Sequence, residues 1–266
     1  MITSIGLGLL IGIVMALTGA GGGILAVPLL VFFAHLDVAQ AGPIGLLAVG
    51  LAAALGASFG LKTRTLRYRA ALLIAGAGML LSPVGFWLAQ RLDNRSLGIL
   101  FGFILLFVAF RTYRRAQKRM RGQDPAPRLD LPCVRDAASG RFIWTTKCAR
   151  ALALSGTIAG LLSGLLGVGG GFVMVPALQR YTDLTMQSIV ETSLAVIALI
   201  SLTGVATSAS AGHLNFAIAI PFSGGALAGV IAGRNIASRL AGPQLQKGFA
   251  LVCVVVAAGM LAKALA

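Results

Sequence analysis

The chain has little acidic charge, little cysteine and almost no histidine, and each shortage excludes a class of protein. Its 266 residues include 7 Asp and Glu, 3 Cys and 2 His. There is no Cys-x-x-Cys pair and no Cys/His ligand set, so the sequence indicates neither a metal site nor a structural disulfide, and no cofactor is expected. Charged residues make up only 11% of the chain, too few to cover the surface of a soluble domain of this length.

Long apolar runs fill the chain instead. The composition is 58% hydrophobic, and the mean hydropathy is +0.92. Several runs reach the length of about 18 residues that is typical of a membrane helix. None shows the alternation of a barrel strand, and backbone in lipid must satisfy its own hydrogen bonds. The sequence therefore predicts an all-α polytopic membrane protein, with its first segment retained because a basic n-region and a cleavage site are lacking.

Basic residues are concentrated beside the apolar runs. The net charge is +15, and eleven of the 22 Lys and Arg lie between residues 111 and 150. Four more lie between residues 62 and 69. Basic clusters next to membrane segments set topology and contact anionic head groups, so both stretches are expected in the cytoplasm. The expected partners are membrane lipid and a small anionic substrate, with no nucleic acid.

One sequence unit occurs twice. "LTGAGGGILAVP" begins at residue 17 and "LLGVGGGFVMVP" at residue 165, an offset of 148 residues that also relates Gly56 to Gly204. Matched Gly and Pro residues at a constant offset indicate a duplication rather than shared hydrophobicity. The predicted organisation is a first membrane repeat over 1–112, a basic cytoplasmic linker over 113–150 and a second membrane repeat over 151–266.

Each repeat is predicted to hold four segments. The first of each, over 4–34 and 152–180, is interrupted by glycines. The others are expected at 40–61, 70–90, 97–112, 186–210, 217–238 and 245–262. If an interrupted segment crosses once, the repeats are parallel. If it turns back, they are inverted, and Arg180, Arg239 and Lys247 then join the linker in the cytoplasm, as the positive-inside rule favours.

The glycine runs are the first candidate site. A run of glycines unwinds a helix and restarts it with unpaired N–H groups, which bind oxyanions without a fixed cation. Broken first segments in inverted repeats are typical of secondary transporters. The alternative is that the glycines only allow close helix packing. The candidate substrate-binding residues are Gly21, Gly22, Gly23, Gly169, Gly170 and Gly171.

Four polar residues of the second repeat complete the candidate set. Thr192 and Ser193 could donate to an anion or bond back to their own helix. Glu191 is a candidate for carrying a coupling proton, or it closes a capping box with Ser188 at a helix start. Arg234 is either a counter-charge for the substrate or a side chain that reaches the membrane interface.

The duplicated motif resembles a known family. "ALTGAGGGILAVPLL" and "GLLGVGGGFVMVPAL", together with "ETSLAV" at 191–196 and "GHLNF", resemble the sulfite exporter TauE/SafE family of membrane permeases. The resemblance implies transport of sulfite, sulfonates or related small anions across the bacterial cytoplasmic membrane. "GPIGLLAV" stands in the first repeat where the second has Thr192 and Ser193, so the two repeats are expected to contribute unequally.

The function predicted is secondary transport of a small oxyanion by alternating access, by a multi-pass protein of the bacterial inner membrane that is not an enzyme. Two alternatives remain open. One is an intramembrane hydrolase with Ser163 as nucleophile and His213 as base, and the other is a non-transporting scaffold that uses the basic linker. A homodimer is compatible with either kind of protein.

Overall fold

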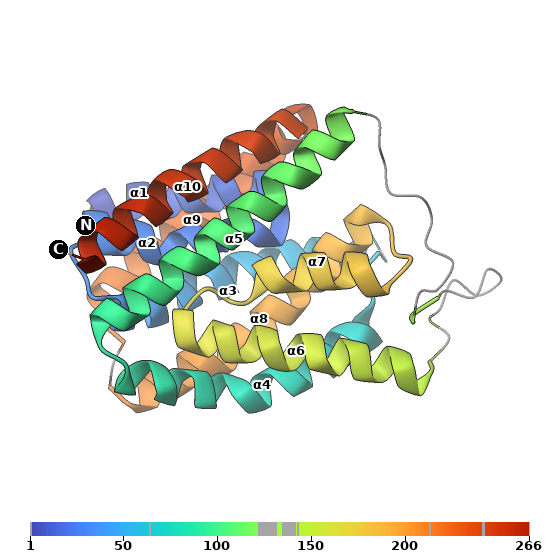
Figure 1. The fold of residues 1–266 in the computed structure, drawn as a ribbon, viewed down its shortest axis with the longest axis horizontal. Helices are drawn as coiled ribbons and strands as arrows, with labels where there is room; N and C mark the ends of the chain where they lie inside the picture. Colours follow the sequence, from blue (N-terminus) through green and yellow to red (C-terminus); the bar gives the residue numbers. More distant parts are fainter. Residues whose placement is uncertain are drawn as a thin grey trace.

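The computed structural model describes residues 2–63, 65–121, 132–134, 142, 144–212, 214–240 and 243–265, and nearly all of them are helical (Figure 1). Among these residues, seven helices are long and apolar enough to cross a membrane. The predicted all-α polytopic membrane protein is confirmed. The helices of the first half are α1 (Ile2–Thr18), α2 (Ala26–Phe33), α3 (Val38–Lys62), α4 (Tyr68–Arg91) and α5 (Asn94–Met120). Those of the second half are α6 (Thr146–Leu166), α7 (Gly171–Tyr181), α8 (Met186–Ser210), α9 (Phe216–Leu240) and α10 (Pro243–Leu265).

Helix α5 is longer than the sequence pattern predicts. It continues to Met120, beyond the expected end of the apolar segment at residue 112. The added turns carry Arg and Lys side chains, which form helix well and need no apolar surroundings. A hydropathy pattern marks only the part of a helix that lies in lipid. The turns after residue 112 were therefore predicted as part of the linker.

The two halves pack on each other through helices that exchange partners. Helix α1 packs on α9 and α4 packs on α6, with close backbone approach at Gly12 against Gly229 and at Gly160 against Gly78. The offset of 148 residues relates Gly12 to Gly160. Small residues allow such approach in membrane bundles. The packing of α1 on α9 therefore has the packing of α6 on α4 as its counterpart.

The central helices α3 and α8 repeat this exchange. A Cβ added at Gly56 would lie 2.7 Å from Leu194 Cδ1, and one added at Gly204 would lie 2.8 Å from Leu46 Cδ1. The offset of 148 residues relates Gly56 to Gly204 and Leu46 to Leu194. The two contacts are thus the same contact with the halves exchanged.

The chain ends lie together. Both termini are at one end of the bundle, and α5 ends and α6 begins at the opposite end (Figure 1). Helices α5 and α10 are antiparallel, because a Cβ at Gly98 would lie 3.4 Å from Ala264 Cβ while Lys247 Nζ lies 5.7 Å from the ring of Tyr113. At the end with the termini, Lys263 Nζ donates to the Val31 carbonyl at 3.3 Å.

A disulfide corrects one expectation from the sequence. Cys133 and Cys148 are bonded, with their Cα atoms 4.9 Å apart. Cys133 also donates its backbone N–H to the Tyr181 carbonyl at 3.1 Å. The start of α6 and the end of α7 are therefore neighbours, so α7 returns toward the end from which α6 came. Sequence spacing gave no sign of the pair, because only the fold brings the two residues together.

Two buried apolar clusters enclose the second glycine run. The larger includes Ile24, Val49 and Val168, and the other includes Met174 and Ile200. Val168 precedes the glycines at 169–171 and Met174 follows them. The glycines at 169–171 consequently lie between the two clusters, at the centre of the fold.

Candidate functional site

The two glycine runs have different backbone structures. Gly21, Gly22 and Gly23 belong to a 3₁₀ helix, η1 (Gly19–Leu25), which continues into α2 with the Ala26 N–H donating to the Gly23 carbonyl. In the second run Gly169 and Gly170 have φ of 74° and 68°, the left-handed region, and α7 starts at Gly171. A left-handed φ costs little only at glycine. The two runs therefore do not form two similar helix starts.

The two glycine runs nevertheless both approach the side chain of Val49. A Cβ at Gly23 would lie 3.0 Å from Val49 Cγ1 and 3.5 Å from the Val168 carbonyl oxygen. A Cβ at Gly169 would lie 3.1 Å from the same Val49 methyl. Gly22, Gly23 and all residues from 167 to 171 are buried. The structure thus brings together glycines that are far apart in the sequence and closes them from solvent.

A buried hydroxyl borders this meeting point. A Cβ at Gly169 would lie 3.3 Å from Ser201 Oγ of α8, and that oxygen is buried without a hydrogen-bond partner. The nearby Ser208 bonds back to the Gly204 carbonyl at 2.8 Å, as helical serines usually do. An unpaired buried hydroxyl costs free energy, so Ser201 is a strong candidate for contact with a ligand.

The start of α7 adds backbone donors. The N–H groups of Val173 and Met174 both donate to the Gly170 carbonyl, at 3.1 and 3.2 Å. The N–H groups of Gly171 and Phe172 precede these bonds, and the first N–H groups of a helix have no partner within it. The second glycine run thus has the positive start of α7 at its end and the Ser201 hydroxyl beside Gly169.

Ser82, which was not selected from the sequence, and Ser163, considered there only as a nucleophile, also carry buried hydroxyls. Their side-chain oxygens are buried without partners, and Ser82 Oγ would lie 3.5 Å from a Cβ at Gly204. The offset of 148 residues relates Ser82 to Val230 and Ser201 to Ala53, so neither hydroxyl has a counterpart in the other repeat. A lone serine in an apolar segment gives no periodic signal, so sequence reasoning could not select them.

Thr192 and Ser193 lie further along α8. Thr192 Oγ1 accepts a hydrogen bond from the Arg67 backbone N–H at 3.2 Å, which ties α8 to the connection between α3 and α4. Nine residues separate Thr192 from Ser201, about 13 Å along a helix. Ser193 Oγ is buried without a partner. Of the predicted hydroxyl pair, Thr192 accepts a hydrogen bond, whereas Ser193 has no hydrogen-bond partner.

Glu191 does not cap α8, and the capping-box interpretation is wrong. The N-cap is Thr185, whose hydroxyl accepts from the Ser188 N–H at 3.4 Å, while Ser188 Oγ donates to the Thr65 carbonyl. The Glu191 Oε1 accepts from Gln187 Nε2 at 3.1 Å, and its Oε2 is buried without a partner. The carboxyl is therefore half-buried in the second turn of α8, with Oε2 turned inward and Oε1 in an exposed hydrogen bond.

Two further predicted residues cannot be placed with their side chains. Arg234 belongs to α9, and its side chain lies outside the described part of the chain. His213, the base of the hydrolase alternative, is also outside the described residues. Among the described residues, no group of three or more His, Cys, Asp or Glu could hold a metal ion.

Buried, unpaired polar groups at a helix break within a polytopic membrane bundle are typical of one class, the membrane transporters. The comparisons with known proteins identify the family. The model of the family described as "Sulfite exporter TauE/SafE" matches residues 4–260, so the chain belongs to this family. No solved structure matches the chain.

Two curated relatives extend this finding. A protein of Bacillus subtilis (strain 168) named "Probable membrane transporter protein YunE" is 28% identical over 233 residues, which cover 83% of this chain and 82% of the relative. A "Probable membrane transporter protein" of Xylella fastidiosa (strain Temecula1 / ATCC 700964) is 28% identical over 263 residues, covering 97% and 93%. The protein is accordingly a multi-pass transporter of the bacterial inner membrane and not an enzyme.

Proposed function

We propose that the protein is a secondary transporter, working as an exporter, of small sulfur-containing or organic oxyanions such as sulfite or sulfonates. Transport would proceed by alternating access around the two glycine segments. The observation that carries the proposal is the meeting of Gly23 and Gly169 across Val49, beside the unpaired hydroxyl of Ser201. Family membership supports the transporter class, and the site chemistry supports the anion.

The site would hold an oxyanion with neutral donors. The Gly171 and Phe172 N–H groups and the Ser201 hydroxyl can each donate to an oxygen of the substrate. Hydrogen bonds to a charged acceptor are the stronger kind, typically about 1.5–3 kcal/mol. A site without a fixed cation also releases its anion readily, which a transporter requires. Ser193, further along α8, would serve the same anion on its path.

An inverted arrangement of the repeats would supply the alternating access. It is supported by the exchanged contacts of α1 with α9 and α4 with α6, and by the first half, which begins at one end of the bundle and finishes with α5 at the opposite end (Figure 1). In inverted repeats, the site lies at their interface, and rocking of one unit against the other exposes it to each side in turn. The buried glycines would then represent a closed state between two open ones.

Glu191 would couple the transport to a proton. Its Oε2 is buried without a partner, 2.9 Å from where a Cβ at Gly60 would lie, and an ionisable side chain inside a membrane bundle is a candidate for proton transfer. Arg67 lies close by, with its Nε buried without a partner and its backbone N–H donating to Thr192 Oγ1. Arg67 was not selected from the sequence, where it reads as one cation of a basic loop.

A binding experiment on one hydroxyl tests the proposal. Purified protein is heated with sulfite, thiosulfate, a short sulfonate and a carboxylate, for the parent and for Ser201→Ala. A ligand at about 100 times its dissociation constant raises the free energy of unfolding by about 2.7 kcal/mol. We expect sulfite or the sulfonate to stabilise the parent, and Ser201→Ala to lower the affinity at least tenfold without loss of stability, because the lost hydroxyl has no partner.

Ser223→Ala is the matched control. Ser223 Oγ is likewise buried without a partner, but it lies in α9, which packs on α1. This variant should bind as the parent does. Equal affinity of the parent and Ser201→Ala for every stabilising anion would contradict the role of Ser201. Stabilisation of the parent by none of the anions would contradict the proposed substrate class.

A further inference from the structure

The end of α5 carries a pocket that the transport cycle does not use. It has a volume of about 490 Å³ and is lined by Phe107, Phe110, Arg111, Arg114, Arg115, Gln117, Lys118 and Arg121. The sequence of α5 from residue 94 to residue 120 contains no Asp or Glu. Five cations therefore line the pocket without an acid from the same helix.

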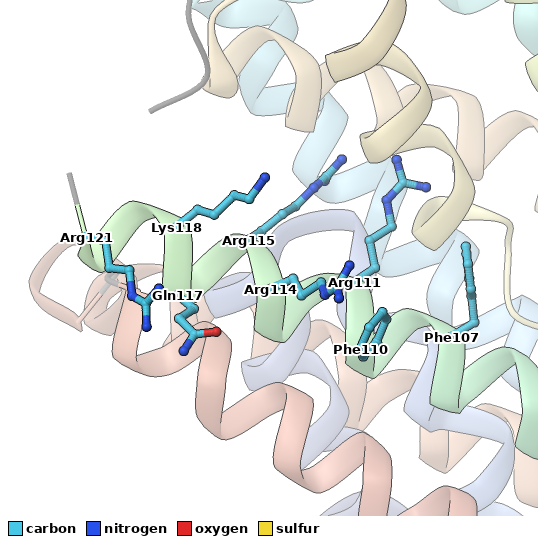
Figure 2. Close-up of a pocket in the computed structure, with 8 residues that line it drawn as sticks. All are labelled: Phe107, Phe110, Arg111, Arg114, Arg115, Gln117, Lys118 and Arg121. Carbon is cyan, nitrogen blue, oxygen red and sulfur yellow. The ribbon is translucent and has the colours of Figure 1, made fainter. Parts of the chain in front are cut away.

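The lining residues form two rows on α5. Figure 2 shows Phe107, Arg111, Arg115 and Lys118 extending to one side of the helix and Gln117 and Arg121 to the other, with Phe110 and Arg114 along the helix between them. Spacings of three and four residues keep each row on one face. The lining begins with the two phenylalanines and continues with cations. The pocket is consequently apolar at its start and strongly positive further along the same axis.

This order matches the boundary of a membrane. The rings of Phe107 and Phe110 are 62% and 55% exposed, on the part of α5 that is apolar enough to span lipid. Cations begin at Arg111, and the rise to Arg115 is about 6 Å along the helix. The head-group layer on each side of a bilayer is about 5–7 Å thick. The apolar start would thus face acyl chains while the cations face phosphates.

We propose that this pocket binds an anionic phospholipid, with its phosphate among Arg111, Arg114 and Lys118 and its acyl chains against Phe107 and Phe110. Arginine forms paired hydrogen bonds with phosphate oxygens, and lysine adds a point charge. Arg114 is already held over the Phe110 ring, 4.4 Å from its centroid, which orders it for the head group. The site is separate from the glycine segments and does not depend on the transported substrate.

Native mass spectrometry of the purified full chain tests the proposal. The protein is titrated with phosphatidylglycerol, with phosphatidylcholine of the same acyl chains, and with inorganic phosphate as a probe for a free anion. We expect at least tenfold tighter binding of phosphatidylglycerol than of phosphatidylcholine. The triple variant Arg111→Gln/Arg114→Gln/Lys118→Gln should lose this preference, because glutamine keeps most of the side-chain length and removes the charge.

A second triple variant controls for charge alone. Lys62→Gln/Arg69→Gln/Arg180→Gln removes three exposed cations at the same end of the bundle but outside the pocket, and should keep the preference. Loss of the preference in both triples, or no preference in the parent, would overturn the proposal. So would displacement of phosphatidylglycerol by equimolar inorganic phosphate, which would indicate a site for a free anion. If the pocket triple fails to fold, the exposed single changes Arg114→Gln and Lys118→Gln replace it, each with a smaller expected loss.

Discussion

Gly170 shows what one residue can and cannot reveal about the site. Its φ is +68°, and a Cβ there would lie 2.6 Å from the Ala159 carbonyl oxygen. The glycine is therefore required by the backbone, whether or not it contacts an anion. The packing alternative considered from the sequence holds at this position. A change at Gly170 would alter the fold and the site together, which is why Ser201 is the better probe.

Alanine at Gly170 should destabilise the protein more than alanine at Gly23. A left-handed φ costs a non-glycine residue roughly 1–2 kcal/mol, and the contact with the Ala159 carbonyl adds to that. At Gly23 the added methyl meets only the Val49 methyl groups, at 3.0 and 3.1 Å, and φ is not left-handed. Thermal unfolding of both variants in one detergent checks this order. A melting temperature of Gly170→Ala equal to that of Gly23→Ala would contradict the left-handed loop.

Replacement of Glu191 separates coupling from binding. If its buried carboxyl carries the proton, Glu191→Gln should abolish pH-gradient-driven accumulation while anion exchange between equal pools continues. Because Glu191 is not the cap of α8, the variant should keep its stability, and Gln187→Ala serves as a control that removes only the hydrogen bond to Oε1. Normal gradient-driven transport by Glu191→Gln would rule out the coupling role.

At the scale of single residues, the sequence singled out the glycines, Thr192 and Ser193 but not Ser201. Three consecutive glycines in an apolar segment are a strong departure from helix propensity, so Gly169–Gly171 stood out. Ser201 is one serine among several in helices, and only its position beside Gly169 distinguishes it. Glu191 was found as an intramembrane acid, but its capping role failed because Thr185 begins the helix earlier.

At the scale of elements, the bonds that join the ends of α6 and α7 were not predicted from the sequence. These ends are joined by the Cys133–Cys148 bond and by the hydrogen bond from Cys133 to Tyr181. Disulfides persist in oxidising compartments and are reduced in the cytosol. The basic residues around Cys148, in contrast, favour the cytoplasm. The redox state of the pair in cells therefore reports the side of the membrane on which it lies.

We expect Cys133 and Cys148 to be thiols in living cells and to form the disulfide on purification in air. Cells are quenched in acid, and free thiols are then tagged with a mass-shifting maleimide under denaturing conditions. Cys253, the buried free cysteine of α10, provides the internal reference of one tag. Two further tags are predicted. Full protection of both residues in freshly quenched cells would place the segment on the oxidising side and contradict the cytoplasmic linker.

For the whole molecule, hydropathy predicted the membrane segments but not how they pair. Helices α3, α4, α8 and α9 lie within two or three residues of the predicted ranges, because lipid demands long apolar runs. The contact of α1 with α9 rather than with its neighbours in sequence depends on glycine surfaces such as Gly12 and Gly229. A repeat offset reveals that two units exist and leaves open how they pack.

Orientation gives a prediction for the whole chain. If the repeats are inverted and the basic end is cytoplasmic, a cysteine at Arg180 is hidden from an impermeant thiol reagent in intact cells. A cysteine at Ser96, exposed in the first turn of α5 at the opposite end, is labelled. Both changes are made in a chain without its three native cysteines. Labelling of Arg180→Cys from outside would contradict the orientation, and permeabilised cells confirm that each cysteine is reactive.

The central claim is that the protein moves an oxyanion across the membrane without altering it, and flux in reconstituted vesicles tests it most directly. Proteoliposomes are loaded with sulfite, and its release is followed for the parent, Ser201→Ala and Ser223→Ala. The account predicts saturable, protein-dependent release of unchanged sulfite or sulfonate, lowered at least tenfold by Ser201→Ala and unchanged by Ser223→Ala. Folded parent protein that releases sulfite, thiosulfate and sulfonates no faster than protein-free vesicles would contradict it.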